Sequence, residues 1–230
     1  MNGVCLMSRA PGLSLLLLLL VPLSQAGCSW MQPRNWGTLP DAMNIFGTSG
    51  GTLSVTSTAD AEETLQGQFQ SGIYSSGDPN SATMILYDGP ADNPAAAVTI
   101  RMFWSPDAGR TPIDATATNA TIQYIIFDGN GIGIAIYSGA GYFYPNSSVG
   151  NDKFTGSVWQ SSLRLTDKSE GYEDKLGQAQ LKGKFTVNRD DLAIDEALHK
   201  LNVQVRERLG RTRLVHEAMP TVRTARIDRE

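Results

Sequence analysis

The sequence predicts a mainly β domain of about eight antiparallel strands, arranged as a sandwich or an up-and-down barrel, with one C-terminal amphipathic α-helix. Three observations lead to this prediction. Apolar and polar residues alternate with period two between residues 52 and 188. Clusters of Gly, Pro, Asn and Asp separate the alternating runs. From residue 189 onward, apolar residues recur every three or four positions, which is the period of a helix.

The first segment, residues 1–27, has the features of a signal peptide. A leucine-rich run from Leu13 to Leu23 follows the positively charged Arg9. The run is too short to span a bilayer comfortably, but it has the length of the apolar core of a secretory signal. We therefore expect the protein to be exported.

The signal ends in Ala26, Gly27 and Cys28. This ending resembles the lipobox of bacterial lipoproteins, although Gln25 stands where that family prefers Leu, Val or Ile. The resemblance implies that Cys28 is the lipid attachment site and the mature N-terminus. It also implies a place in the cell envelope, on the outer membrane facing the periplasm, because the residue after the cysteine is Ser29 and not Asp.

Ordinary secretion is the alternative. Ser24, Gln25 and Ala26 satisfy a small-x-small cleavage rule, which would release a soluble protein that begins at Gly27. Cysteine usage favours the lipoprotein, because Cys28 is the only cysteine outside the signal. A single unpaired thiol is unusual in an exported domain unless it is consumed, as it would be by lipidation.

Residues 28–50 are expected to form a tether, and residues 51–188 the β-domain. The hairpin signal is clearest at Asp128-Gly129-Asn130-Gly131, whose residues favour the positive φ angles of a tight turn. The alternation and the breakers predict strands near 52–58, 64–74, 82–88, 96–104, 115–127, 131–143, 156–166 and 179–188.

Residues 189–210 are predicted to form an amphipathic helix that packs on the β-domain. Asn188 or Asp190 is a suitable cap for its start, and Gly210 is placed to end it. The apolar stripe that would face the sheet consists of Ile194, Ala197, Leu198, Leu201, Val205 and Leu209. Self-association through this stripe is an alternative. Residues 211–230 have no periodicity and are expected to be a flexible tail.

Composition excludes several kinds of chemistry. The chain has two histidines, His199 and His216, so residues 28–188 contain none. A Ser-His-Asp triad, a Cys-His pair or a histidine-rich zinc site inside the β-domain is thereby excluded. The net charge is −4, and no basic patch precedes the C-terminal tail, so we expect no nucleic-acid partner. No cofactor motif is present, and none is expected.

Aromatic residues offer the clearest indication of ligand binding. Tyr137, Tyr142, Tyr144 and Trp159 lie on strand stretches and could stack on sugar rings or on a partner's side chains if they share an exposed face. The same residues could instead belong to the core. No metal site is predicted, although Asp88 and Asp92 share a Gly/Pro loop and form a weak alternative.

Two functions follow from these observations. The first is a lipid-anchored β-domain of the cell envelope that binds a protein partner, a glycan or another small ligand without catalysis. The second is a small envelope hydrolase that uses Asp and Glu as acid and base. The histidine-free sheet and the missing catalytic motifs favour the first.

Overall fold

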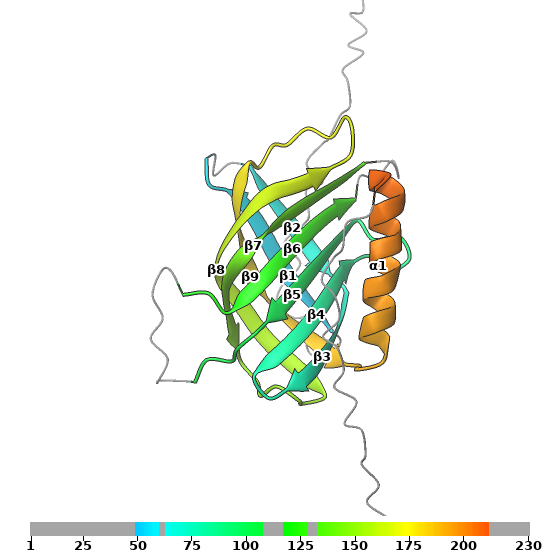
Figure 1. Ribbon diagram of the computed structural model, residues 1–230. Coiled ribbons are helices and arrows are strands. Elements are labelled where there is room, and N and C mark those ends of the chain that lie inside the picture. The colour runs from blue at the N-terminus through cyan, green and yellow to red at the C-terminus, as the bar shows by residue number, and fades with distance from the viewer. Residues whose placement is uncertain (1–48, 60–62, 108–116, 128–132, 212–230) are drawn as a thin grey trace, which may run out of the picture. The chain divides into compact units, whose positions relative to one another are not determined.

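The computed structural model describes residues 49–59, 63–107, 117–127 and 133–211 of the 230-residue chain. The prediction of a mainly β fold with a single C-terminal helix is confirmed (Figure 1). The elements are β1 (Gly50–Ser57), β2 (Thr64–Phe69), β3 (Ser71–Asp78), β4 (Ser81–Asp88), β5 (Ala96–Met102), β6 (Ala120–Phe127), β7 (Ile134–Pro145), β8 (Lys153–Lys168), β9 (Gln178–Arg189) and α1 (Ala193–Leu209).

All nine strands belong to one sheet in the order β2-β1-β9-β3-β4-β5-β6-β7-β8, and β9 also pairs with β8. The sheet therefore curls until its two sides meet at β9 (Figure 1). The pairing is antiparallel except where β3 meets the end of β9, at Ile73–Asn188 and Tyr74–Arg189. That parallel contact corrects the expectation of a purely antiparallel sheet.

The predicted strand 64–74 is wrong as one unit, because the strand is interrupted at Gln70 and its pairing partners change there. Before this residue β2 pairs with β1, and after it β3 pairs with β4. The backbone N–H of Gln70 donates to the carbonyl of Tyr87 at 3.0 Å. Gln70 and Ser71 are consecutive polar residues that interrupt the alternation, so the sequence contains a sign of this break.

Several expectations fall on residues outside the described part of the chain. These are the signal peptide, Cys28, most of the tether, the tail beyond residue 211 and the turn 128–131. On either side of that turn, β6 and β7 pair antiparallel, with Phe127 opposite Ile134.

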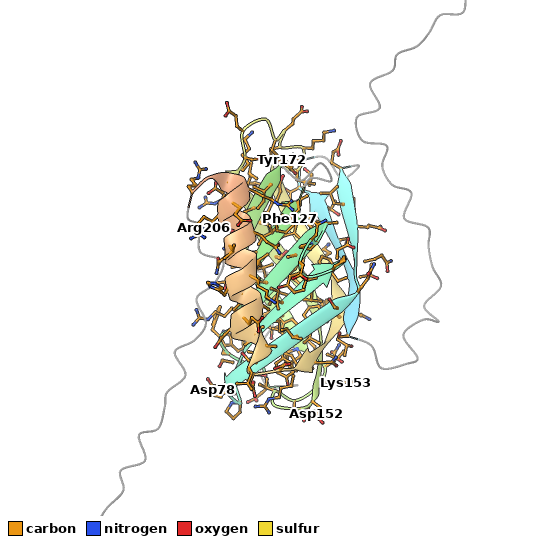
Figure 2. All side chains as sticks on the ribbon, turned by 90° about the vertical axis from the view of Figure 1, so that its right-hand side faces the viewer. Asp78, Phe127, Asp152, Lys153, Tyr172 and Arg206 are labelled. Carbon is orange, nitrogen blue, oxygen red and sulfur yellow. The ribbon has the colours of Figure 1, made fainter. Side chains whose placement is uncertain are left out.

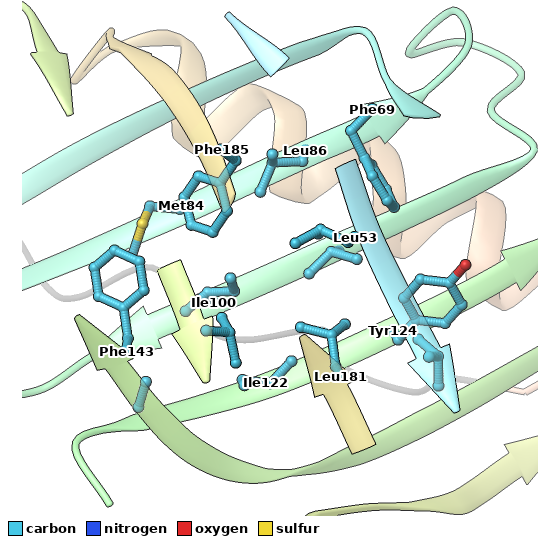
Figure 3. Packing of buried hydrophobic residues seen from close by; sticks show 14 of the residues in the cluster. Leu53, Phe69, Met84, Leu86, Ile100, Ile122, Tyr124, Phe143, Leu181 and Phe185 are labelled. Atoms are coloured by element: carbon cyan, nitrogen blue, oxygen red, sulfur yellow. The ribbon is translucent and has the colours of Figure 1, made fainter. Parts of the chain in front are cut away.

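Inward-facing residues of all nine strands fill the inside of the curled sheet with apolar side chains (Figure 3). The ring of Phe143 stacks on Phe185 with centroids 5.5 Å apart and also packs against Phe154 at 5.7 Å. All three rings are almost completely buried. The core is thus closely packed rather than hollow around these rings.

Glycine allows two close approaches of backbone that build this curvature. Gly183 has a φ of +151°, and a Cβ there would lie 2.2 Å from the carbonyl oxygen of Thr52. A Cβ at Gly139 would lie 1.8 Å from the carbonyl oxygen of Ser162. Any side chain at either position would push neighbouring strands apart.

Helix α1 covers the outer face of β3 to β7 (Figure 2). Its buried residues follow the predicted stripe and are Ile194, Leu198, Leu201 and Val205. Near its start, the carboxylate of Asp190 accepts hydrogen bonds from the N–H groups of Leu192 (3.3 Å) and Ala193 (2.9 Å). Gly210, at φ 66°, ends the helix as predicted. Within the described residues, no helix combines the length and hydropathy needed to cross a bilayer.

Candidate binding face

The structure does not bring the four predicted aromatic residues onto one exposed face. Tyr137 is completely buried, Tyr142 is 1% exposed, and Tyr144 is partly buried. Trp104 packs edge-on against Tyr142, with centroids 6.0 Å apart. Only Trp159 is freely accessible, with 67% of its surface exposed.

Tyr137 has a structural role at one end of the core. Its hydroxyl donates to a carboxylate oxygen of Asp174 at 2.6 Å, and the same oxygen accepts the N–H groups of Leu176 (3.1 Å) and Gly177 (3.0 Å). Burial raises the pKa of the Tyr137 phenol, as do the hydrogen bond to Asp174 and the nearby Tyr172. The contact thus fixes the segment that precedes β9 over this end of the sheet.

The contact predicts a pH-dependent contribution to stability. Desolvation raises the pKa of Asp174, but the Tyr137 and backbone hydrogen bonds outweigh it, so the pKa lies below its ordinary value. A lowered folded-state pKa stabilises the fold above the unfolded-state pKa, and this contribution is lost as the pH falls through the folded value. We therefore expect Asp174→Asn to lower the free energy of unfolding at pH 7, with a difference that shrinks below about pH 4. Urea denaturation across this range measures it; a difference independent of pH would contradict the assignment.

Asp88 and Asp92 differ in their exposure to solvent. Asp88 is 6% exposed at the end of β4, whereas Asp92 lies in the exposed loop that follows. The main-chain carbonyl of Asp92 accepts a hydrogen bond from the Gln204 amide at 3.2 Å. In the part of the chain that the structure describes, no three His, Cys, Asp or Glu side chains form a group able to hold a metal ion.

Trp159 lies on the outer face of β8. Its indole N–H donates to the hydroxyl of Ser157 at 3.0 Å, so the ring lies over the strand in the direction of Ser157. Ser157 pairs with Lys184 of β9, and Val158 pairs with Gly183. The exposed ring is therefore placed beside the row of side chains that begins with Lys184.

That row continues across two more strands. Lys184 is opposite Thr52 of β1, and Thr52 is opposite Gln68 of β2. The neighbouring row contains Lys182, Ser54 and Gln66 in the same register. These side chains alternate with core residues and so point away from the core. We call this surface the Trp159 face: Trp159, Lys182, Lys184, Thr52, Ser54, Gln66 and Gln68.

The two lysines give the Trp159 face a charge opposite to that of the chain around it. Residues 1–188 contain 10 basic and 15 acidic residues, a net charge of −5. The only charged members of the face are Lys182 and Lys184, and both are exposed. A local positive surface on an acidic domain attracts anionic ligands and orients their approach.

A hollow lies between α1 and the strands β3 and β4. It has a volume of about 290 Å³, and Ile73, Tyr87 and Ala197 supply apolar walls. An ion pair between Glu196 and Lys200, 2.8 Å long, belongs to its lining. The hollow is at the lower end of the range for ligand pockets, and its paired charges are already satisfied.

Alternation within residues 181–187 places Lys182 and Lys184 on the outer side of the sheet, so the sequence contains part of this signal. The contribution of Thr52 and Ser54 depends on the pairing of β1 with β9, which connects residues more than a hundred positions apart, and Gln68 joins them through the pairing of β1 with β2. No local pattern specifies that pairing.

Comparison of the chain with protein-family models, with curated proteins and with solved structures finds no match. The function is therefore inferred from the residues of the chain and their arrangement.

Proposed function

We propose that this protein is an exported, lipid-anchored β-domain of the cell envelope that binds an acidic glycan through the Trp159 face. One observation carries the proposal: the Trp159 side chain is 67% exposed, and it lies beside the two rows of side chains that contain Lys182 and Lys184. An exposed indole is free to contact a ligand, and aromatic rings of this kind are frequent anchors of binding surfaces. The indole would stack on a sugar ring, and the two ammonium groups would pair with carboxylate or phosphate groups along the polymer.

The polar neighbours suit the same ligand. Thr52, Ser54 and Gln68 add hydroxyl and amide groups that donate to and accept from sugar hydroxyls. The closely packed interior supports binding on the outside of the sheet, because the inward side chains of this region, such as Leu53, Leu181 and Phe185, are almost completely buried.

The alternative function, an envelope hydrolase, requires two carboxylates fixed on opposite sides of a cleft. Asp88 is buried and Asp92 is exposed on a loop, so this pair does not favour that reaction.

Binding is tested with the full chain and a soluble acidic polysaccharide, by isothermal titration calorimetry. We expect Trp159→Ala to weaken binding at least about tenfold, since loss of a stacked aromatic anchor costs more than about 1.4 kcal/mol. Lys182→Glu with Lys184→Glu should weaken it further and reduce its salt dependence.

The matched controls are Phe103→Ala, which removes another exposed aromatic ring, and Lys175→Glu, which reverses an exposed charge in the loop before β9. Both should bind as the unchanged protein does. Equal losses in the control variants, or binding to anionic lipid vesicles in place of the polysaccharide, would refute the glycan proposal.

Anchoring is tested separately. Metabolic labelling with a palmitate analogue should label the unchanged protein and leave Cys28→Ser unlabelled, because Cys28 is the acceptor that the lipobox resemblance implies. The Cys28→Ser protein should move from the membrane fraction to the soluble fraction. Equal labelling of both proteins would exclude a lipid on Cys28 without affecting the glycan proposal.

A further inference from the structure

The strand β2 lies at the end of the strand order, and among the described residues one of its edges is open. Within the described residues it pairs with β1 alone. Its sequence is Thr-Leu-Gln-Gly-Gln-Phe, without a charged residue or a proline. Sheet edges are normally protected by charges, proline or bulges, because their free N–H and C=O groups pair readily with another strand.

Two hydrogen bonds show which backbone groups face the open edge. The N–H of Ser57 donates to the carbonyl of Glu63 at 2.9 Å, so residue 63 points toward β1. The N–H of Gln70 donates to Tyr87, on the opposite side. In an antiparallel strand, the N–H and C=O of one residue point to the same neighbouring strand, and those of the next residue point to the opposite side. Gln66 and Gln68 therefore direct their backbone groups away from β1.

The side chains along this edge are suited to a partner strand. Leu65 is 38% exposed, and it points to the same side of the sheet as the core residue Val55, its register partner. Gly67, two residues further, has no side chain and is buried, because the Phe69 ring occupies the space where its Cβ would lie. The edge therefore presents one exposed apolar side chain beside a residue that has no side chain.

We infer that β2 pairs antiparallel with β2 of a second copy of this chain, about a two-fold axis at Gln66. In this register the N–H and C=O of Gln66 bond to the same groups of Gln66 in the other copy. Leu65 then lies opposite Gly67 of the second copy, so no bulky side chain opposes it across the new strand pair. The register is self-complementary, as a two-fold interface requires.

This pairing joins the two sheets into one and makes their outer faces continuous. Gln66 and Gln68 belong to the Trp159 face, so the second copy extends that face across the axis. Two ligand-binding surfaces on one rigid assembly increase avidity for a repeating polymer. The dimer itself does not depend on the identity of the ligand.

Cysteine crosslinking tests the register in the full chain carrying Cys5→Ser and Cys28→Ser. Directly opposed residues of a hydrogen-bonded pair have Cα atoms about 5.5 Å apart, which suits a disulfide. Gln66→Cys should therefore form a covalent dimer under mild oxidation. Gln68→Cys is the matched control. In the proposed register, residue 68 of one copy is four residues away from residue 68 of the other copy, about 13 Å along the strand. The Gln68→Cys variant should remain uncrosslinked.

Sedimentation gives a second, independent measurement. Gln66→Pro removes the edge N–H without removing a bond to β1, and should convert the dimer to a monomer with an unchanged circular dichroism spectrum. Gln66→Ala keeps the N–H and should remain a dimer. A monomeric unchanged protein, a Gln66→Pro dimer, or equal crosslinking at positions 66 and 68 would overturn the inference. If Gln66→Pro fails to fold, the crosslinking pair decides alone.

Discussion

Phe143→Ala is expected to lower the free energy of unfolding by about 3–5 kcal/mol. The ring is completely buried, stacked on Phe185 and packed against Phe154. It also covers Gly156, where a Cβ would lie 2.0 Å from the ring. A rigid sheet cannot collapse around the missing ring, so the substitution leaves a cavity in addition to the lost apolar burial.

Urea denaturation followed by circular dichroism measures this loss. The control is Phe103→Ala, whose ring is 47% exposed and whose removal should change stability by less than about 0.5 kcal/mol. Equal stabilities of the two variants would show that Phe143 is not part of a closely packed core.

Asn119→Ala is expected to have a comparable effect through lost hydrogen bonds. The Asn119 side chain is fully buried just before β6. Its oxygen accepts the N–H of Phe143 at 2.7 Å, and its amide donates to the carbonyl of Phe143 at 2.8 Å and to that of Trp104 at 3.3 Å. The side chain thus continues the β6–β7 ladder where the backbone pairing ends.

Alanine leaves the N–H and C=O of Phe143 buried without these partners. The cost is about 1–3 kcal/mol for each group. Asn119→Asp should restore the acceptor only and recover part of the loss. Asn146→Ala is the matched control, because Asn146 is exposed. Thermal unfolding checks the series. An Asn119→Ala protein as stable as the Asn146→Ala protein would show that water replaces these bonds.

The class of fold and the helix could be predicted from the sequence, because both depend on local periodicity. Gly210 and the buried stripe of α1 lie where the pattern placed them. The parallel contact of Ile73 with Asn188 could not be predicted, since it depends on the closure of the sheet through distant strands. Asn119 was missed for the same reason, because its partners belong to other parts of the chain.

The candidate site was predictable only in part. Trp159 was identified as an aromatic residue on a strand, and the structure shows its exposure. Tyr137 and Tyr142 lie on opposite sides of β7, and both are buried: Tyr137 faces the core, while Tyr142 packs against Trp104. The alternation of residues along a strand shows which side chains point outward, but it cannot show that another segment of the chain covers them. The lysine rows likewise require the register of β1, β2 and β9.

The location of ligand binding tests the proposed function most directly. Backbone amide chemical shifts of the isotopically labelled full chain are recorded during titration with a soluble acidic oligosaccharide. Binding through the Trp159 face predicts that shifts cluster at Ser157–Gln160 and Lys182–Lys184, with smaller changes at Thr52–Ser54, and that the Trp159 indole N–H moves with them. Shifts confined to the hollow between α1 and β3, or to the core residues, would contradict it.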